Sequence, residues 1–192
     1  RYGGYWRYPK MLDYCYLVNP LFPNQRLINE MKQSFEMLLG NYPSGAMVNN
    51  LLVSKYFGVD RKHICVGNGA AELIKAFLER IEGKVGIINP TFEEYPNRLN
   101  KEQLEFYCPQ NETYSYDAGD LISYYGDKEI EVLTLINPDN PSGNYINFSG
   151  LKKLLQWTKE RNITFVVDES FIDFAEERVT LIQEELLLNN PH

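Results

Sequence analysis

Two segments that follow apolar runs carry side chains able to do chemistry, and the first contains Asp168. This carboxylate comes directly after the apolar run 163–167, so we expect it at the end of a buried strand. There it could cap the next segment, ligate Mg²⁺ in a nucleotide-hydrolysing enzyme, or partner a buried cationic nitrogen. The magnesium interpretation requires a GxxxxGK(S/T) motif upstream, which the sequence lacks. The other two interpretations stay open.

The second segment, 137–143, reads NPDNPSG and follows the apolar run 132–136. A proline favours an extended conformation in the residue before it, so Asn140 is held rigidly with an amide donor and an acceptor available. The segment is either a binding loop that presents Asn140 or a proline-rich turn without a ligand.

Two further segments are weaker signals. Residues 67–72, GNGAAE, join an expected strand to an expected helix, where free N–H groups favour a phosphate. Glu72 replaces the third glycine of a dinucleotide-binding GxGxxG, so a tight turn is the alternative interpretation. Phe92 follows the apolar run 85–88 and could stack on a planar ligand or simply pack. Cys65 has no histidine partner and is interpreted as a buried small hydrophobe.

The elements that must position these residues follow from the apolar patterns. Helical spacing predicts helices at about 27–40, 48–58 and 70–80, and one from a Ser149 cap to about 161. The sequence predicts strands at 63–66, 85–88, 104–107, 132–136 and 163–167, of which 85–88, 132–136 and 163–167 are mainly apolar runs. Strands of this kind between amphipathic helices indicate a mainly parallel α/β sheet, which binds ligands beyond the carboxyl ends of its strands. The four segments described above are all expected at that edge.

Composition excludes several classes of protein. The 192 residues carry 19 Lys and Arg against 26 Asp and Glu, a net charge of −7, which argues against nucleic acid or an anionic membrane as main partner. No apolar run approaches the length of about 20 residues that a membrane-spanning helix needs. Three cysteines and two histidines leave little for a disulfide framework or a metal site, and a cytoplasmic location fits best. Because the chain begins with Arg1 rather than Met, we expect it to be part of a longer protein.

Taken together and in this order, GNGAAELI, NPTFEEYP, INPDNPSG and VVDESFIDF resemble the fold-type I pyridoxal-phosphate enzymes, the class I/II aminotransferases. The closer likeness is to the histidinol-phosphate aminotransferase and threonine-phosphate decarboxylase group. The resemblance implies the three-layer α/β large domain of that fold and pyridoxal 5′-phosphate as cofactor. Residues 1–45 would form an N-terminal arm and first helix, and 46–192 an incomplete first part of the cofactor-binding domain.

The resemblance also assigns roles to single residues. Asp168 would be the catalytic carboxylate, pairing with the pyridine nitrogen and raising the pKa of that nitrogen. Asn140 would hydrogen-bond the ring hydroxyl oxygen, and Phe92 would stack on the ring.

Phosphate contacts are implied in the same way. Backbone N–H groups of Gly69, Ala70 and Ala71 would bind the 5′-phosphate at a helix start. Tyr42, in a Tyr-Pro pair similar to the family's RYP element, would reach the phosphate of a neighbouring subunit. This implies a homodimer with shared active sites.

The sequence departs from the family pattern at three points. Phe171 stands where the aminotransferases usually have tyrosine, which favours the decarboxylase branch. Arg1 and Tyr2 replace the usual histidine before Gly3-Gly4. No lysine follows Asp168, so we expect the Schiff-base lysine and the small C-terminal domain beyond His192, and an inactive fragment without them.

The expected function is a PLP-dependent aminotransferase or amino-acid decarboxylase. Its substrate would be a small amino acid. Phosphorylated or phosphonate-bearing ones are favoured by Phe171 and by Gly3-Gly4, Leu12-Asp13 and Asn19-Pro20-Leu21, which together resemble the start of the decarboxylase branch. The phrase GGYWRY at 3–8 also resembles the aminotransferase half of nucleotidyltransferase fusions, so a fused nucleotidyltransferase domain is a further expectation. One alternative is a non-catalytic regulatory or binding module that retains the fold. Another is a nucleotide-binding α/β enzyme, but the sequence lacks both GxxxxGK(S/T) and a complete GxGxxG.

Overall fold

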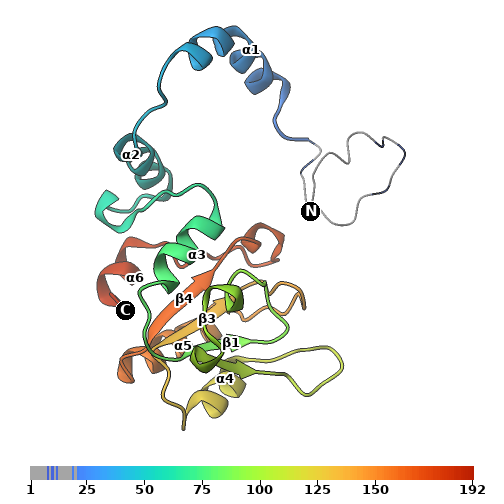
Figure 1. The fold of residues 1–192 in the computed structure, drawn as a ribbon, viewed down its shortest axis with the longest axis vertical. Coiled ribbons are helices and arrows are strands. Elements are labelled where there is room, and N and C mark those ends of the chain that lie inside the picture. The colour runs from blue at the N-terminus through green and yellow to red at the C-terminus, as the bar shows by residue number, and fades with distance from the viewer. Residues whose placement is uncertain (1–7, 9, 11, 13–18, 20) are drawn as a thin grey trace. The chain divides into compact units, whose positions relative to one another are not determined.

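The computed structural model describes residues 8, 10, 12, 19 and 21–192 (Figure 1). The expected motif residues Arg1, Tyr2 and Gly3-Gly4 lie outside the described residues, as does most of the GGYWRY phrase. The chain divides into two compact units, Arg1–Gly45 and Ala46–His192, and each is described by itself.

The first unit contains one helix, α1 (Gln25–Gly40), within its described residues. The Asn24 side chain accepts a hydrogen bond from Leu27 N at 3.0 Å and thereby caps the helix. Met31, Phe35 and Leu38 follow one another at helical spacing, and each is more than half exposed. The helix predicted at 27–40 is confirmed, with an apolar stripe on its surface.

The second unit is built on a four-stranded sheet (Figure 1). Its strands are β1 (Val85–Ile88), β2 (Leu104–Tyr107), β3 (Val132–Ile136) and β4 (Thr164–Asp168). Their order is β2-β1-β3-β4, and every neighbouring pair is parallel. The mainly parallel sheet predicted from the sequence is confirmed. Parallel pairing brings the carboxyl ends of the strands to one edge.

Five α-helices of the second unit precede, separate or follow the strands, and only 3₁₀ turns lie between β1 and β2. The helices are α2 (Ala46–Phe57), α3 (Ala70–Leu78), α4 (Ala118–Tyr125), α5 (Phe148–Glu160) and α6 (Glu184–Asn189). The sequence patterns do not predict the short helices α4 and α6. The predicted cap of α5 is wrong: Asn147 Oδ1 accepts from Gly150 N at 2.9 Å, while Ser149 lies inside the first turn. Asn147 caps the helix because its backbone is extended, as a capping residue requires.

Each face of the sheet carries its own apolar layer. Leu133 and Leu135 of β3 belong to a buried cluster with residues of α4 and α5, including Leu121 and Leu154. The intervening β3 side chains point to the other face, where Val132 and Ile136 belong to a cluster with Ile74 and Leu78 of α3. Helix, sheet and helix therefore form three layers, as expected for the continuous apolar runs.

The predicted strand at 63–66 is wrong. His63 ends a 3₁₀ turn (Arg61–His63), and residues 64–67 form no strand. A strand needs a ladder partner, and here the Val66 N–H donates instead to Asn50 Oδ1 of α2 at 3.0 Å. Cys65, expected to be buried in that strand, is exposed.

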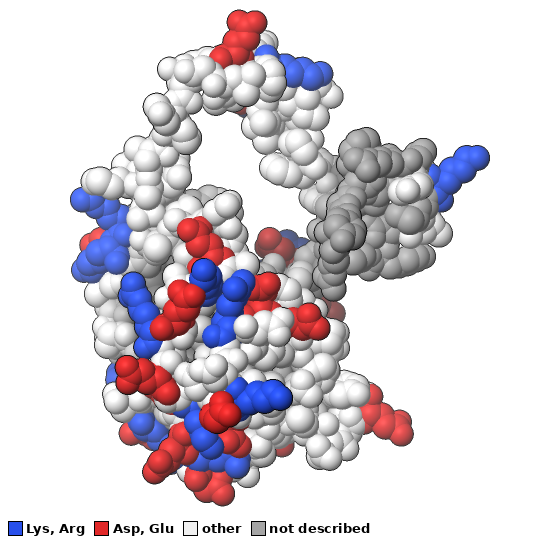
Figure 2. All heavy atoms as spheres, in the orientation of Figure 1, with Lys and Arg blue, Asp and Glu red and all other residues white. Residues whose placement is uncertain are grey.

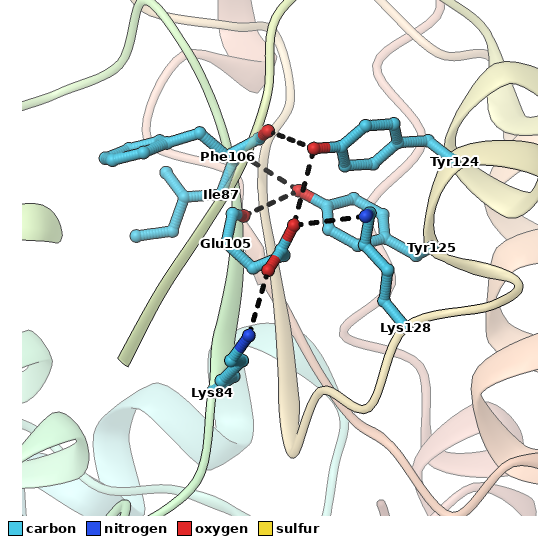
Figure 3. Close-up of polar contacts among 7 residues, drawn as sticks. All are labelled: Lys84, Ile87, Glu105, Phe106, Tyr124, Tyr125 and Lys128. Atoms are coloured by element: carbon cyan, nitrogen blue, oxygen red, sulfur yellow. Dashed lines mark hydrogen bonds and ion pairs between the residues drawn. The ribbon is translucent and has the colours of Figure 1, made fainter. Parts of the chain in front are cut away.

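A charged cluster lies toward the amino ends of β1 and β2 (Figure 3). Glu105 of β2 pairs with Lys84 and with Lys128, each at 3.3 Å. Partial desolvation opposes the charge of Glu105, but the hydrogen bonds and charges of the two lysines outweigh it. The pKa of the Glu105 carboxyl is therefore below its usual value. Beside it, the buried Tyr125 hydroxyl points at the backbone oxygens of Ile87 (3.0 Å) and Glu105 (3.1 Å).

Acidic and basic side chains are intermixed over the visible face of the second unit (Figure 2). Among the helices of the described residues, none has the length and apolarity needed to cross a membrane.

Candidate functional site

The carboxyl edge of the sheet brings three of the predicted segments together. Asn137 N donates to Asp168 O at 2.8 Å, which extends the pairing of β3 and β4 beyond the last residue of β3. Val166, two residues before Asp168, packs in the cluster on the α3 side of the sheet. Because side chains alternate along a strand, the Asp168 carboxylate emerges on that same side. The predicted position of Asp168 at a strand end is confirmed.

Both oxygens of the Asp168 carboxylate accept a hydrogen bond. Oδ1 accepts from Ser170 N at 2.9 Å, and Oδ2 accepts from the Tyr95 hydroxyl at 2.9 Å. Tyr95 belongs to the segment after β1 and is only 4% exposed. Burial, and secondarily the negative charge of Asp168, raise the pKa of the Tyr95 phenol far above its usual value. The hydroxyl therefore keeps its proton and donates a hydrogen bond to the carboxylate.

Sequence reasoning gave Tyr95 no role. The only signal was its place in the NPTFEEYP segment, three residues after Phe92. Its bond to Asp168 depends on the strand order, since β1 and β4 flank β3 from opposite sides. No pattern in the sequence states which strands are neighbours.

The loop 137–143 is held rigidly from inside. Asn137 is 1% exposed; its Nδ2 donates to Ile146 O at 2.9 Å, and its Oδ1 accepts from Ile146 N at 2.8 Å. Asp139 is also buried and accepts a hydrogen bond from the Ser142 hydroxyl. Burial raises the pKa of the Asp139 carboxyl, against the hydrogen bonds from Ser142 and the Asn140 backbone.

Asn140 differs from both of these neighbours. It is partly buried, and we find no hydrogen bond between its side chain and any of the described residues. Its amide donor and acceptor are therefore available to a ligand, while the loop around them is fixed. This arrangement is compatible with the predicted ligand contact, which stays a prediction.

The start of α3 has the backbone that the sequence suggested. Gly69 precedes the helix with φ 85° and ψ 166°, a conformation in which a side chain would be strained. Ala70 and Ala71 follow and are exposed, and the N–H groups of a first helical turn have no intrahelical acceptor. Glu72 lies in this turn, and its carboxylate accepts a hydrogen bond from Asn68 N. An anion bound here would meet that carboxylate as well as the N–H groups.

Of the two predicted aromatic contacts, Phe92 and Tyr42, only Phe92 belongs to the same unit as the carboxyl edge. Phe92 lies after β1 and is 37% exposed, so part of the ring is open to a ligand. Tyr42 is fully exposed, but it belongs to the unit Arg1–Gly45, so its relation to this edge stays a prediction. Among the described residues, no three His, Cys, Asp or Glu side chains are grouped to hold a metal ion.

The family follows from a match over most of the chain. Residues 24–189 match the family described as aminotransferase class I and II. The chain belongs to this family. The resemblance seen in the four motifs is thereby confirmed, and membership of this family indicates pyridoxal 5′-phosphate as the cofactor.

Individual relatives agree with the family. The chain is 32% identical to the L-serine phosphate decarboxylase of Campylobacter jejuni, over 86% of this chain and 44% of that protein. Its fold matches a decarboxylase from Sulfurospirillum multivorans with a TM-score of 0.76 and 28% identity, over 96% of this chain and 50% of the other. A histidinol-phosphate aminotransferase from Clostridium acetobutylicum matches with a TM-score of 0.75 and 28% identity, over 94% and 53%. The chain thus spans about half the length of the relatives it matches.

Proposed function

We propose that the carboxyl edge of this sheet binds pyridoxal 5′-phosphate in an aminotransferase or amino-acid decarboxylase. The observation that carries the proposal is the Asp168 carboxylate, fixed at the end of β4 on the side of α3. Residues 46–192 would be the first part of the cofactor-binding domain, and 1–45 the arm and first helix.

The chemistry of the available groups suits this cofactor. When bound, it supplies an electron sink for the carbanion formed at the substrate Cα, provided that its pyridine nitrogen stays protonated. Asp168 would hold that proton on the nitrogen, because an adjacent negative charge raises the pKa of a cationic acid. Asn140, whose amide has no partner among the described residues, would bind the ring hydroxyl oxygen.

The remaining contacts complete the proposed site. The exposed part of Phe92 would cover one face of the ring. The N–H groups of Gly69, Ala70 and Ala71 would bind the phosphate at the start of α3. Tyr42 would contact the phosphate bound by a second subunit, so the protein would be a homodimer with shared sites.

For the substrate we propose a small amino acid that carries a phosphate or phosphonate group. The name of the Campylobacter jejuni relative, an L-serine phosphate decarboxylase, supports this class. Phe171, in place of the usual tyrosine, favours decarboxylation over transamination. A cytoplasmic location and a fused nucleotidyltransferase domain complete the proposal.

The test is an absorption spectrum of the protein expressed to its natural stop codon, titrated with pyridoxal 5′-phosphate. We expect a new cofactor band that borohydride reduction removes, with the label on a lysine identified by peptide mass spectrometry. O-phosphoserine, O-phosphothreonine and an aminophosphonate are then supplied, and carbon dioxide and keto-acid release are measured. Carbon dioxide alone identifies the decarboxylase. No cofactor band contradicts the proposal and favours the non-catalytic module.

A further inference from the structure

The Asp168 carboxylate is restrained by donors from two different elements. Ser170 N is local, only two residues further along the chain, and moves with Asp168. Tyr95 lies 73 residues away in the sequence, on the segment that follows β1. The terminal torsion of an aspartate side chain has a broad energy profile, so one local donor restrains its plane weakly. The second donor, coming from across the sheet, fixes it.

Tyr95 is itself held rigidly enough to act as such an anchor. Its ring packs in the cluster on the α3 side of the sheet, together with Ile87 and Ile136. Pro96 follows directly and begins a 3₁₀ turn (Pro96–Arg98). A phenol fixed by its ring can place its hydroxyl in only a narrow range of positions, which makes Tyr95 a rigid donor.

The same tyrosine is linked to the aromatic residue at this edge. Tyr95 N donates to Phe92 O at 3.3 Å, so both residues belong to one turn. A shift of this turn therefore moves the exposed Phe92 ring and the donor to Asp168 together. Each carboxylate oxygen has further acceptor capacity beyond one hydrogen bond, so Asp168 can still accept from a ligand.

We propose that Tyr95 is a positioning residue, whose hydroxyl orients the Asp168 carboxylate toward the ring nitrogen of the cofactor. This inference rests on the proposed function, because it presumes that Asp168 faces that nitrogen. Tyr95 does not touch the cofactor in this proposal and acts only through Asp168.

The experiment compares two ligands on the protein expressed to its natural stop codon. Pyridoxal 5′-phosphate carries the ring nitrogen, and its 1-deaza analogue lacks it. Tyr95→Phe removes only the hydroxyl. We expect it to weaken the binding of pyridoxal 5′-phosphate about tenfold, and that of the analogue less than twofold. Dissociation constants are measured by titrating protein fluorescence, so that no turnover is needed.

Tyr125→Phe is the matched control. It also removes a buried tyrosine hydroxyl, but one that faces the backbone oxygens of Ile87 and Glu105. We expect the ratio of the two dissociation constants to stay at the wild-type value. As a second measurement, Tyr95→Phe is placed on an Asp168→Asn background. On that background Tyr95→Phe should leave the ratio of the two dissociation constants at the value of Asp168→Asn alone, because residue 168 no longer carries the charge that Tyr95 positions.

The outcomes separate the two proposals. If wild-type protein prefers the ligand with the nitrogen and Tyr95→Phe weakens both ligands equally, or neither, then Tyr95 only packs and the inference is overturned. A further loss of discrimination on the Asp168→Asn background overturns it too, since Tyr95 would then act independently of Asp168. If wild-type protein binds neither ligand, or both equally, the proposed function itself fails and takes the inference with it.

Discussion

The Tyr95 hydroxyl and Asp168 Oδ2 are 2.9 Å apart, although the residues are 73 positions apart in the sequence. One belongs to the segment after β1 and the other ends β4, with β3 between the two strands. The hydrogen bond therefore connects the segment after β1 with the end of β4 at the carboxyl edge of the sheet.

The two asparagines of the 137–143 loop should separate stability from ligand binding. Asn137→Ala leaves the Ile146 N–H and C=O groups buried without partners, and should lower the free energy of unfolding by about 2–4 kcal/mol. Asn140→Ala should change it by less than about 0.5 kcal/mol, yet weaken pyridoxal 5′-phosphate binding about tenfold. Urea unfolding and cofactor titration measure the two effects. An Asn140→Ala variant with unchanged affinity would contradict the predicted ligand contact.

Replacing Gly69 should cost stability through backbone strain alone. A Cβ there meets no atom within 4 Å, but φ is +85°, so Gly69→Ala should lower the free energy of unfolding by about 1–3 kcal/mol. Cofactor affinity should fall as well if the start of α3 binds the phosphate. Gly45→Ala is the control, because that position is equally open and is not at positive φ. We expect it to be neutral or slightly stabilising in thermal unfolding.

Glu105 should stabilise the fold at neutral pH and not in acid. The pKa of its carboxyl is lowered in the folded state, so the stabilisation is complete above the unfolded value of about 4.5. It is lost as the pH falls through the folded value. Glu105→Gln should therefore cost up to about 1 kcal/mol at pH 7 and progressively less below pH 4.5. Urea unfolding of wild type and variant from pH 7 to below pH 4.5 measures this difference in stability. Cofactor affinity at pH 7 should not change.

Asp139 should show the opposite dependence on pH. The pKa of its carboxyl is raised by burial, so the folded state holds the proton more tightly than the unfolded chain does. Stability attributable to this group is present below its unfolded value and is lost as the pH rises through the folded value. At pH 8 the free energy of unfolding of Asp139→Asn should therefore equal or exceed that of wild type. Toward pH 4 wild type should gain stability relative to the variant, because its Asp139 carboxyl becomes protonated. A variant equally destabilised at both pH values would show that Asp139 acts only through its hydrogen bonds.

The parallel α/β class and the positions of most elements follow from local patterns in the sequence. Continuous apolar runs such as 132–136 indicate strands buried on both faces, and Val132 and Leu133 do pack into opposite layers. The position of Asp168 after such a run followed for the same local reason. The strand expected at 63–66 was wrong because a strand also needs a neighbour, which local pattern does not supply.

The contacts among the residues at the carboxyl edge, by contrast, depend on the tertiary fold. The order β2-β1-β3-β4 places Tyr95 against Asp168. The fold of the loop gives the Asn137 side chain two hydrogen bonds to Ile146, whereas the Asn140 side chain has no partner among the described residues. Such differences depend on which distant groups are in contact and on how deeply each is buried. Residue type and spacing specify the groups that are able to bind, whereas packing decides which of them are already satisfied and which stay available to a ligand.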